Sequence, residues 1–265
     1  MKKNIINFLK IISVLYLLVC VALYFLQEKL IFFPQQLEKN YQFNFGQNVD
    51  ELNFKASDGT LLNGLLFKAD NTKGLIFYLH GNAGSLSSWG NVAKTYTELN
   101  YDVFILDYRG YGKSEGTING QKQLFEDNDI IYKELKKNYD EQDILILGYS
   151  IGTGMASKLA SNNNPKQLIL QAPYYSLTDM MRKKFPFIPT FILKYKFATQ
   201  EYLQDCEMPI TIFHGNEDDV ISYESSLRLK EKYKTKIKFI TLNGQGHNGI
   251  TENKDYKQEL KNMLY

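Results

Sequence analysis

The longest stretch of hydrophobic residues lies near the N-terminus, where an uncharged run covers residues 11–27 after three lysines in the first ten positions. A helix needs roughly 17–25 mainly apolar residues to cross the hydrocarbon core of a bilayer. Residues 8 and 9 lengthen the run if the side chain of Lys10 extends toward the membrane surface. We therefore expect residues 1–33 to form an uncleaved membrane anchor. Its far end carries aromatic residues suited to a bilayer interface, namely Tyr24, Phe25, Phe32 and Phe33.

Three other interpretations of this segment fit less well. A cleaved signal peptide needs small residues at its cleavage site, and residues 24–28 (YFLQE) offer none. A lipid-modified Cys20 would need a small residue before it, but Val19 is there. A buried core helix would stand outside the repeating pattern of the rest of the chain. The lysines before the run, against the mixed pair Glu28 and Lys29 after it, favour a single-pass protein with a cytoplasmic N-terminus and its folded domain outside the cytoplasmic membrane.

Beyond a polar and aromatic connector at residues 34–48, short apolar runs alternate with helical stretches. Runs that are apolar along their whole length are buried on both faces, as in a parallel sheet covered by helices. Residues 51–57 and 61–68 flank a turn at residues 58–60 (DGT), and this hairpin adds an antiparallel edge. The six further predicted strands are residues 75–80, 103–108, 144–148, 167–171, 210–214 and 237–242.

Helices are predicted between these strands. In residues 121–137, apolar side chains recur on one face with charged residues between them, as in an amphipathic helix. The alternation predicts a three-layer α/β sandwich with a mostly parallel eight-stranded sheet, in a domain at residues 49–265. Functional residues of such sheets gather at the carboxyl ends of the strands. The other predicted helices are residues 87–99, 152–160 and 223–233 and one at the C-terminus.

Composition excludes several classes of protein. Thirty-one basic against 29 acidic residues give a net charge of +2, so no excess of positive charge marks a nucleic-acid binder. Cys20 and Cys206 lie far apart in the sequence, which argues against a disulfide framework or a cysteine zinc site. Three histidines leave few ligands for a histidine-based metal site. We expect neither a metal ion nor an organic cofactor.

The strongest chemical signal is the sequence GYSIG at residues 148–152, which follows a predicted strand and leads into a predicted helix. A sharp strand-to-helix turn leaves little room, so glycines are needed two positions either side of a nucleophile. The turn lifts the Ser150 hydroxyl clear of the sheet and places the helix N-terminus beneath the reacting centre. We take Ser150 as the candidate nucleophile; the alternative is a plain tight turn.

A serine hydroxyl is a poor nucleophile unless a base takes its proton. His247 lies in a glycine-rich loop after the last predicted strand, at residues 244–249 (GQGHNG). His80 and His214 each precede a glycine at a strand end, and there we expect packed histidines that brace loops. His247 is therefore the candidate base.

The base needs a carboxylate that fixes its tautomer and stabilises its cation. Asp218 and Asp219 both follow the strand at residues 210–214. The spacing from His214 favours Asp218, and adjacent residues on an extended loop point opposite ways, so only one of the two reaches the imidazole. The order serine, acid, histidine along the chain is the order expected beside this kind of turn. Asp219 stays open as the alternative acid.

Acyl-transfer chemistry also needs hydrogen-bond donors aimed at the oxyanion. One donor should be the N–H of Ile151, the residue after the nucleophile. The second should come from residues 80–84 (HGNAG), directly after the first buried strand, most simply the N–H of Asn82, with Ala83 as the alternative. An ordinary β-to-α loop is the competing interpretation, because small residues are common there.

These motifs together resemble the α/β-hydrolase superfamily: HGNAG, DYRGYGKSEG, GYSIGTG, and HGNEDDVI with GQGHNG. The sequence is most similar to small membrane-anchored α/β-hydrolase domain-containing proteins, akin to serine aminopeptidase-like and prolyl-oligopeptidase-like domains. The resemblance covers about residues 24–264. It implies Ser150 as nucleophile, Asp218 as acid and His247 as base. It does not select the substrate, because one fold hosts esterases, thioesterases, peptidases and lipases.

The fold usually carries its cap between the strands at residues 167–171 and 210–214, and the insert here covers about residues 174–207. Aromatic and basic residues are interleaved along it. One interpretation is a small aromatic cover over the sheet. The other is a cap near the bilayer that admits acylated or lipid-like substrates, with its basic residues at anionic headgroups. Vesicle binding by a protein lacking residues 1–33 tests the second.

The sequence thus predicts a membrane-anchored serine hydrolase that cleaves carboxylic ester or thioester bonds of a small-molecule or lipid-like substrate through an acyl-enzyme. A serine peptidase or aminopeptidase is the alternative within the enzymes. A catalytically silent anchored scaffold, which binds a partner through the aromatic cap, is the alternative from another class. Nucleic acid is not an expected partner.

Overall fold

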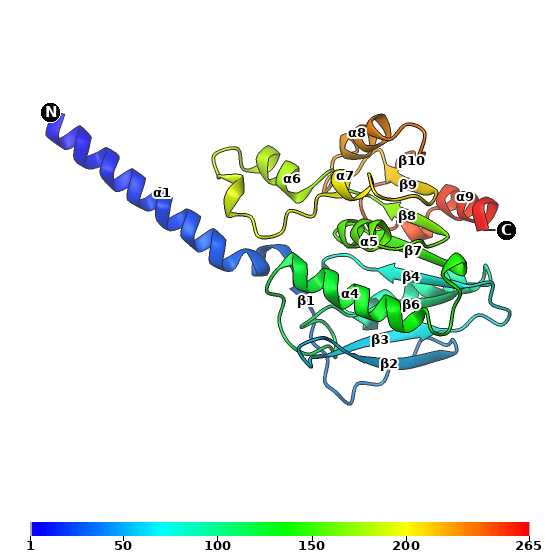
Figure 1. Cartoon of the computed structure of the whole chain (residues 1–265). Helices are drawn as coiled ribbons and strands as arrows, with labels where there is room; N and C mark the ends of the chain where they lie inside the picture. The colour runs from blue at the N-terminus through cyan, green and yellow to red at the C-terminus, as the bar shows by residue number, and fades with distance from the viewer. Residues whose placement is uncertain (1, 265) are drawn as a thin grey trace.

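An eight-stranded sheet forms the centre of the computed structural model, which describes residues 2–264 of the chain (Figure 1). The strand order is β10-β9-β8-β7-β4-β6-β3-β2. The strands from β10 to β6 run parallel, whereas β3 is antiparallel to both of its neighbours. The predicted α/β sandwich with an antiparallel hairpin edge is therefore confirmed. The strands are β2 (Val49–Lys55), β3 (Leu61–Phe67), β4 (Leu75–Leu79), β6 (Asp102–Leu106), β7 (Ile144–Tyr149), β8 (Gln167–Gln171), β9 (Ile210–Gly215) and β10 (Ile237–Leu242).

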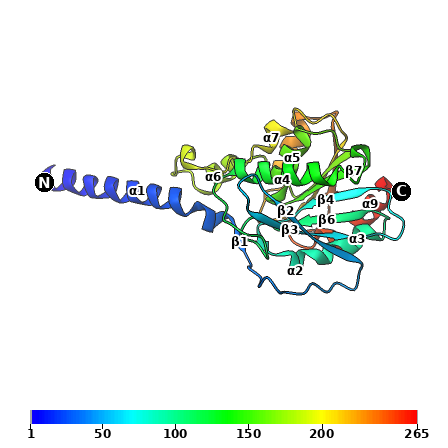
Figure 2. The same cartoon turned by 60° about the horizontal axis from the view of Figure 1, so that its bottom comes forward.

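Helices cover both faces of the sheet, so alternate residues of one strand enter different cores (Figure 2). In β4, Phe77 packs in the core beneath α4, α5 and α8, and Tyr78 packs in the core beneath α2, α3 and α9. Burial on both faces explains why the central strands are apolar along their whole length. The helices are α2 (Leu86–Trp89), α3 (Ala93–Thr97), α4 (Gln121–Leu135), α5 (Gly152–Ser161), α8 (Glu224–Lys232) and α9 (Lys254–Leu264), with short 3₁₀ turns at Gly90–Val92, Glu141–Asp143 and Ile250–Glu252.

The expected helix at residues 87–99 differs from the structure, which has α2, a 3₁₀ turn and α3 in its place. Gly90 lies at the break. A Cβ there would come within 2.3 Å of the Phe45 ring, so this ring packs where only a glycine leaves space. Glycine also weakens a helix interior by about 1 kcal/mol relative to alanine, and the chain tightens into a short 3₁₀ turn at this point.

The N-terminal helix α1 (Lys2–Ile31) has 30 residues and extends away from the sheet (Figures 1 and 2). By length and composition it is able to cross a membrane, and of its side chains only those of Cys20 and Gln27 are buried inside the described part of the protein. After it, the two-residue strand β1 (Phe33–Pro34) pairs with β5 (Ala83–Gly84). Through this pairing, the end of the apolar helix is joined to the loop that follows β4.

The segment between β8 and β9 lies outside the sheet, on the side that faces α1 (Figure 1). Its elements are α6 (Leu177–Lys184), a 3₁₀ turn at Thr190–Ile192 and α7 (Thr199–Tyr202). The middle of this segment contacts α1 through Ile192 and Lys194, and the chain then returns to the core through Tyr195 and Phe197, both fully buried.

Candidate active site

Ser150 occupies a sharp turn between the end of β7 and the start of α5. Its φ is +52°, in the left-handed region that non-glycine residues seldom adopt. Two backbone hydrogen bonds hold it there: its N–H donates to the Gln171 carbonyl at 3.0 Å, and its carbonyl accepts from the Thr153 N–H at 3.0 Å. A strained backbone of this kind is retained only where its surroundings hold it in place. Here the two hydrogen bonds fix the serine at the carboxyl end of the sheet.

Two glycines make this turn sterically possible. A Cβ on Gly152 would lie 2.1 Å from the carbonyl oxygen of Leu79, and a Cβ on Gly148 would lie 2.7 Å from the Cβ of Ala156. Gly152 lets α5 begin directly against β4, and Gly148 lets α5 pack against the strand that carries the serine. The GxSxG spacing is thus explained by close approach of backbone segments.

His247 lies between the serine and a carboxylate. Its Nε2 is 3.0 Å from Ser150 Oγ, and its Nδ1 is 2.7 Å from Asp218 Oδ2. A carboxylate only accepts hydrogen bonds, so Nδ1 carries the proton of the neutral ring and Nε2 is left to accept the serine proton. The structure therefore brings together the three side chains that the sequence singled out, in the orientation that general-base chemistry requires.

Four donors surround the carboxylate of Asp218. Its Oδ1 accepts from the N–H groups of Val220 (2.9 Å) and Ile221 (2.8 Å), while its Oδ2 faces His247 and His214. Burial raises the pKa of this carboxyl, but the hydrogen bonds from His214, His247 and Ile221 outweigh burial and hold the pKa well below its usual range. Asp218 thus stays ionised wherever the protein is folded near neutral pH.

His214 contacts the same carboxylate oxygen, a link that the sequence did not predict beyond a bracing role. Its Nε2 lies 3.1 Å from Asp218 Oδ2 and 3.0 Å from the Ile221 carbonyl, both acceptors, so this nitrogen carries the proton. Its Nδ1 then accepts from the Ser226 hydroxyl at 2.6 Å. The four-residue spacing from His214 to Asp218 was the available signal, because it closes a tight loop directly after β9. His214 is a positioning residue for the carboxylate.

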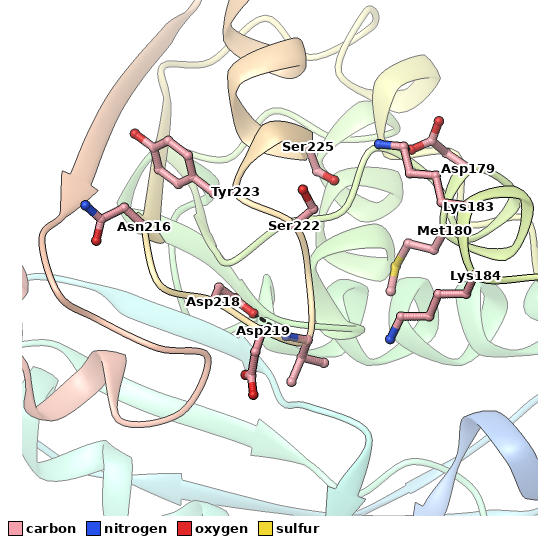
Figure 3. A pocket seen from close by; sticks show the side chains of 11 residues that line it. Asp179, Met180, Lys183, Lys184, Asn216, Asp218, Asp219, Ser222, Tyr223 and Ser225 are labelled. Carbon is pink, nitrogen blue, oxygen red and sulfur yellow. Dashed lines mark hydrogen bonds and ion pairs between the residues drawn. The ribbon is translucent and has the colours of Figure 1, made fainter.

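The neighbouring Asp219 is exposed, and its carboxyl group points away from that of Asp218 (Figure 3). The hydrogen bond to His247 comes from Asp218. Of the two acids that the sequence left open, Asp218 is the one that contacts the histidine.

The loops that carry the acid and the base are bonded to each other. The Glu217 N–H donates to the Gln245 carbonyl at 3.1 Å, and a Cβ on Gly215 would lie 2.0 Å from that same oxygen. The Tyr149 hydroxyl donates to the His247 carbonyl at 2.9 Å, which ties the histidine loop to the residue before the nucleophile. These contacts fix the separation of base and serine.

The candidate oxyanion donors are Asn82, in the loop after β4, and Ile151, directly after the candidate nucleophile. Within residues 2–264, the N–H groups of Asn82 and Ile151 donate to no protein acceptor, so both are free to meet a ligand oxygen. The Asn82 carbonyl, in contrast, accepts from Phe33 N–H (2.8 Å) and from the Tyr111 hydroxyl (2.7 Å). Ala83, the alternative donor, belongs to β5.

A buried pair lies under this loop. His80 Nε2 is 3.8 Å from Asp107 Oδ1, and both side chains are fully buried. Burial lowers the pKa of His80 to about 4 and raises the pKa of Asp107 to about 8, although the Leu86 N–H that donates to Asp107 acts the other way. Both side chains are thus neutral between these values. Asp107 accepts a hydrogen bond from the Leu86 N–H at the start of α2.

Two cavities flank the site. One, of about 380 Å³, lies between α6 and the loop after β9 and is lined by residues that include Asp179, Lys183 and Asp219 (Figure 3). The other, of about 370 Å³, is lined by residues that include Trp89 and Tyr149. Ser150 is in neither lining, so we assign no substrate to them. Over residues 2–264, the His, Cys, Asp and Glu side chains form no cluster of three suited to a metal ion.

The sequence of this chain is similar to those of known proteins. Residues 70–197 match the family model for serine aminopeptidase S33. Human α/β hydrolase domain-containing protein 17B is 30% identical over 200 residues, which cover 73% of this chain and 67% of the human protein. An uncharacterized protein of Acanthamoeba polyphaga mimivirus is 31% identical over 228 residues, 76% of each chain.

Solved structures share the fold at lower identity. An esterase of Pyrococcus furiosus has a TM-score of 0.68 at 18% identity and covers 88% of this chain and 95% of its own. An α/β hydrolase of Vibrio vulnificus has a TM-score of 0.67 at 20% identity, covering 82% and 80%. These solved structures share the fold of this chain. This chain belongs to the α/β-hydrolase superfamily, because it is 30% identical to human α/β hydrolase domain-containing protein 17B over most of its length.

Proposed function

We propose that this protein is a serine hydrolase that cleaves carboxylic ester or thioester bonds through Ser150, His247 and Asp218. The hydrogen bonds that run from Ser150 Oγ to His247 Nε2 (3.0 Å) and from His247 Nδ1 to Asp218 Oδ2 (2.7 Å) carry the proposal. The structural likeness to an esterase supports the choice of ester substrates.

In the proposed reaction, Ser150 Oγ attacks the substrate carbonyl carbon while His247 Nε2 takes the hydroxyl proton. The N–H groups of Asn82 and Ile151 hold the resulting oxyanion. When the tetrahedral intermediate collapses, the alcohol or thiol leaves with the proton from His247, and an acyl-serine remains. Water then attacks the acyl carbon, gives its proton to His247, and the acid departs as Ser150 regains its hydrogen. Asp218 stays ionised and stabilises the imidazolium in both halves.

We place the enzyme on a membrane through α1, which is long and apolar enough to span one. The lysines before the apolar run support a cytoplasmic N-terminus, with the active site on the opposite side. The contacts between α1 and the domain support an uncleaved helix, because Gln27 bonds to both Ile192 and Lys194.

Labelling with a fluorophosphonate probe tests the nucleophile. The full chain should be labelled, Ser150→Ala should not, and Ser161→Ala, at the opposite end of α5, should be labelled like the wild type. A wild-type protein that never reacts would overturn the enzyme assignment in favour of an anchored binding scaffold.

A panel of substrates then separates the bond classes. We expect turnover of nitrophenyl esters or acyl thioesters with a burst of acyl-enzyme. The family model names a serine aminopeptidase, so aminoacyl amides belong in the same panel. Faster cleavage of the amides than of matched esters would replace our assignment with a peptidase.

A further inference from the structure

Residues 185–193 (FPFIPTFIL), here named the cap loop, expose large aromatic side chains on the surface of the protein. The exposed fractions are 58% for Phe185, 86% for Phe187 and 84% for Phe191. Single exposed apolar residues are ordinary on a protein surface, but three aromatic rings on one short uncharged loop form a patch of the kind that marks an interaction site.

Charges bracket this loop on both sides. Arg182, Lys183 and Lys184 directly precede it, and Lys194 and Lys196 follow it, whereas the nine residues between them carry no charge. An apolar segment with basic residues at each end matches a bilayer, whose hydrocarbon lies beneath a surface that is negative when anionic lipids are present. Binding to a protein partner would not by itself explain why basic residues stand on both sides of the cap loop.

The cap loop runs along the helix that we assign to the membrane. Gln27 Nε2 donates to the Ile192 carbonyl at 3.2 Å, and the Tyr16 hydroxyl donates to the Phe187 carbonyl at 2.8 Å. Gln27 lies eleven positions after Tyr16, which at 1.5 Å per residue is about 16.5 Å along the helix axis. Phe187 is therefore held beside the middle of the apolar helix, and Ile192 beside its polar end.

The polar end of this contact carries the charges. The Lys194 N–H donates to Gln27 Oε1 at 2.8 Å, and the Lys194 ammonium lies 3.0 Å from Glu28 Oε1. The Tyr195 hydroxyl donates to the same Glu28 oxygen at 3.0 Å. Polar contacts thus cluster where α1 meets the domain, and the loop becomes apolar as it follows α1 away from the domain.

Some backbone groups of the loop are already satisfied, and this matters in hydrocarbon, where unpaired N–H groups are costly. Pro186 and Pro189 have no N–H to satisfy. The N–H groups of Ile188 and Ile192 donate within the loop, to Phe185 and to Pro189 respectively, and the Phe187 carbonyl accepts from Tyr16 as described above.

We propose that the cap loop enters the bilayer beside α1, with Phe187 and Phe191 in the hydrocarbon and the flanking basic residues at the headgroups. The occupant of this surface is the lipid of the membrane that holds α1. The enzyme then contacts its membrane through two elements, one of which belongs to the cap that adjoins the active site.

The depth of the loop is measurable with the full chain in liposomes of phosphatidylcholine and phosphatidylglycerol. The chain has one tryptophan, Trp89, so each added tryptophan is read against the wild type. We compare Phe187→Trp with Leu17→Trp, at matched height on α1, and with Leu227→Trp, exposed on α8. Lipids brominated in the middle of their acyl chains quench only indoles that lie in the hydrocarbon.

We expect Phe187→Trp and Leu17→Trp to lose fluorescence and shift to shorter wavelength, while Leu227→Trp follows the wild type. Quenching of Leu17→Trp without quenching of Phe187→Trp would overturn the cap-loop proposal and leave the anchor intact. In that case, a blue-shifted emission of Phe187→Trp would point to a second copy of the chain or a lid over the site. If neither Leu17→Trp nor Phe187→Trp is quenched, the assignment of α1 to the membrane fails together with the cap-loop proposal.

Discussion

Replacement of Asp218 by asparagine tests how the carboxylate controls the histidine. Two backbone N–H groups, of Val220 and Ile221, donate to Oδ1. An asparagine must therefore keep its carbonyl oxygen in that position, since backbone N–H groups always donate, whereas the imidazoles at Oδ2 can change tautomer. The amide NH₂ is thereby forced into the place of Oδ2, where it faces His247 Nδ1 and His214 Nε2.

A donor in that place inverts the requirement on the ring. His247 Nδ1 must then accept, so the neutral imidazole carries its proton on Nε2, the nitrogen that faces Ser150. That tautomer cannot take the serine proton. In a serine protease with the same arrangement, this change costs about 10⁴ in kcat, which at 1.36 kcal/mol per tenfold is about 5.4 kcal/mol of transition-state stabilisation. We expect a loss of that order here.

The assay is kcat/KM for a nitrophenyl ester, measured on the full chain, with Asp219→Asn as the matched control. The control should stay near wild type because Asp219 is exposed and lies outside the hydrogen bonds to His247. Unfolding measurements on both variants separate lost chemistry from lost structure. If Asp218→Asn stays within about tenfold of wild-type activity, tautomer control by this carboxylate is wrong.

Two further expectations concern packing and a buried carboxyl group. Gly152→Ala should cost about 1–3 kcal/mol of stability and most of the activity, because its methyl would lie 2.1 Å from the Leu79 carbonyl oxygen. In the control Gly246→Ala the methyl lies 3.8 Å from the nearest atom, and equal melting temperatures of the two variants would refute this expectation. Burial raises the pKa of Asp107 to about 8, so the folded chain keeps a proton that the unfolded chain releases above about pH 4. The free energy of unfolding of the wild type should therefore fall as the pH rises between these values, and that of Asp107→Asn should not fall for this reason. Urea unfolding at a series of pH values would show the difference.

Much of the fold could be predicted because burial on both faces leaves a clear pattern. The predicted strands at residues 167–171 and 237–242 agree with β8 and β10 residue for residue. Ser150 was identifiable because its turn needs glycines at fixed positions, a requirement of backbone geometry that is written locally in the sequence. Features of this kind depend on residues that are near neighbours along the chain.

Features that depend on distant segments were not predictable in the same way. The break at Gly90 arises from the ring of Phe45, which the chain brings back from the connector. The contact between His214 and Asp218 depends on how the loop after β9 closes, and the spacing alone predicted only that His214 braces a loop. The contact between Tyr16 and Phe187 joins residues 171 positions apart, and no local pattern marks such a pair.

The pairing of β1 with β5 has a practical consequence for anyone who prepares this hydrolase without α1. The Phe33 N–H donates to the carbonyl of Asn82, and the Asn82 side chain donates to the Ile31 carbonyl at 3.2 Å. A protein cut after residue 33 is thus not the same catalyst released into water, because the cut removes the support of a loop that we expect to bind the reacting oxygen. Truncation upstream of Ile31 keeps that support. The kinetics of two fragments cut on either side of Ile31 would therefore report how much the turnover depends on the last turn of α1.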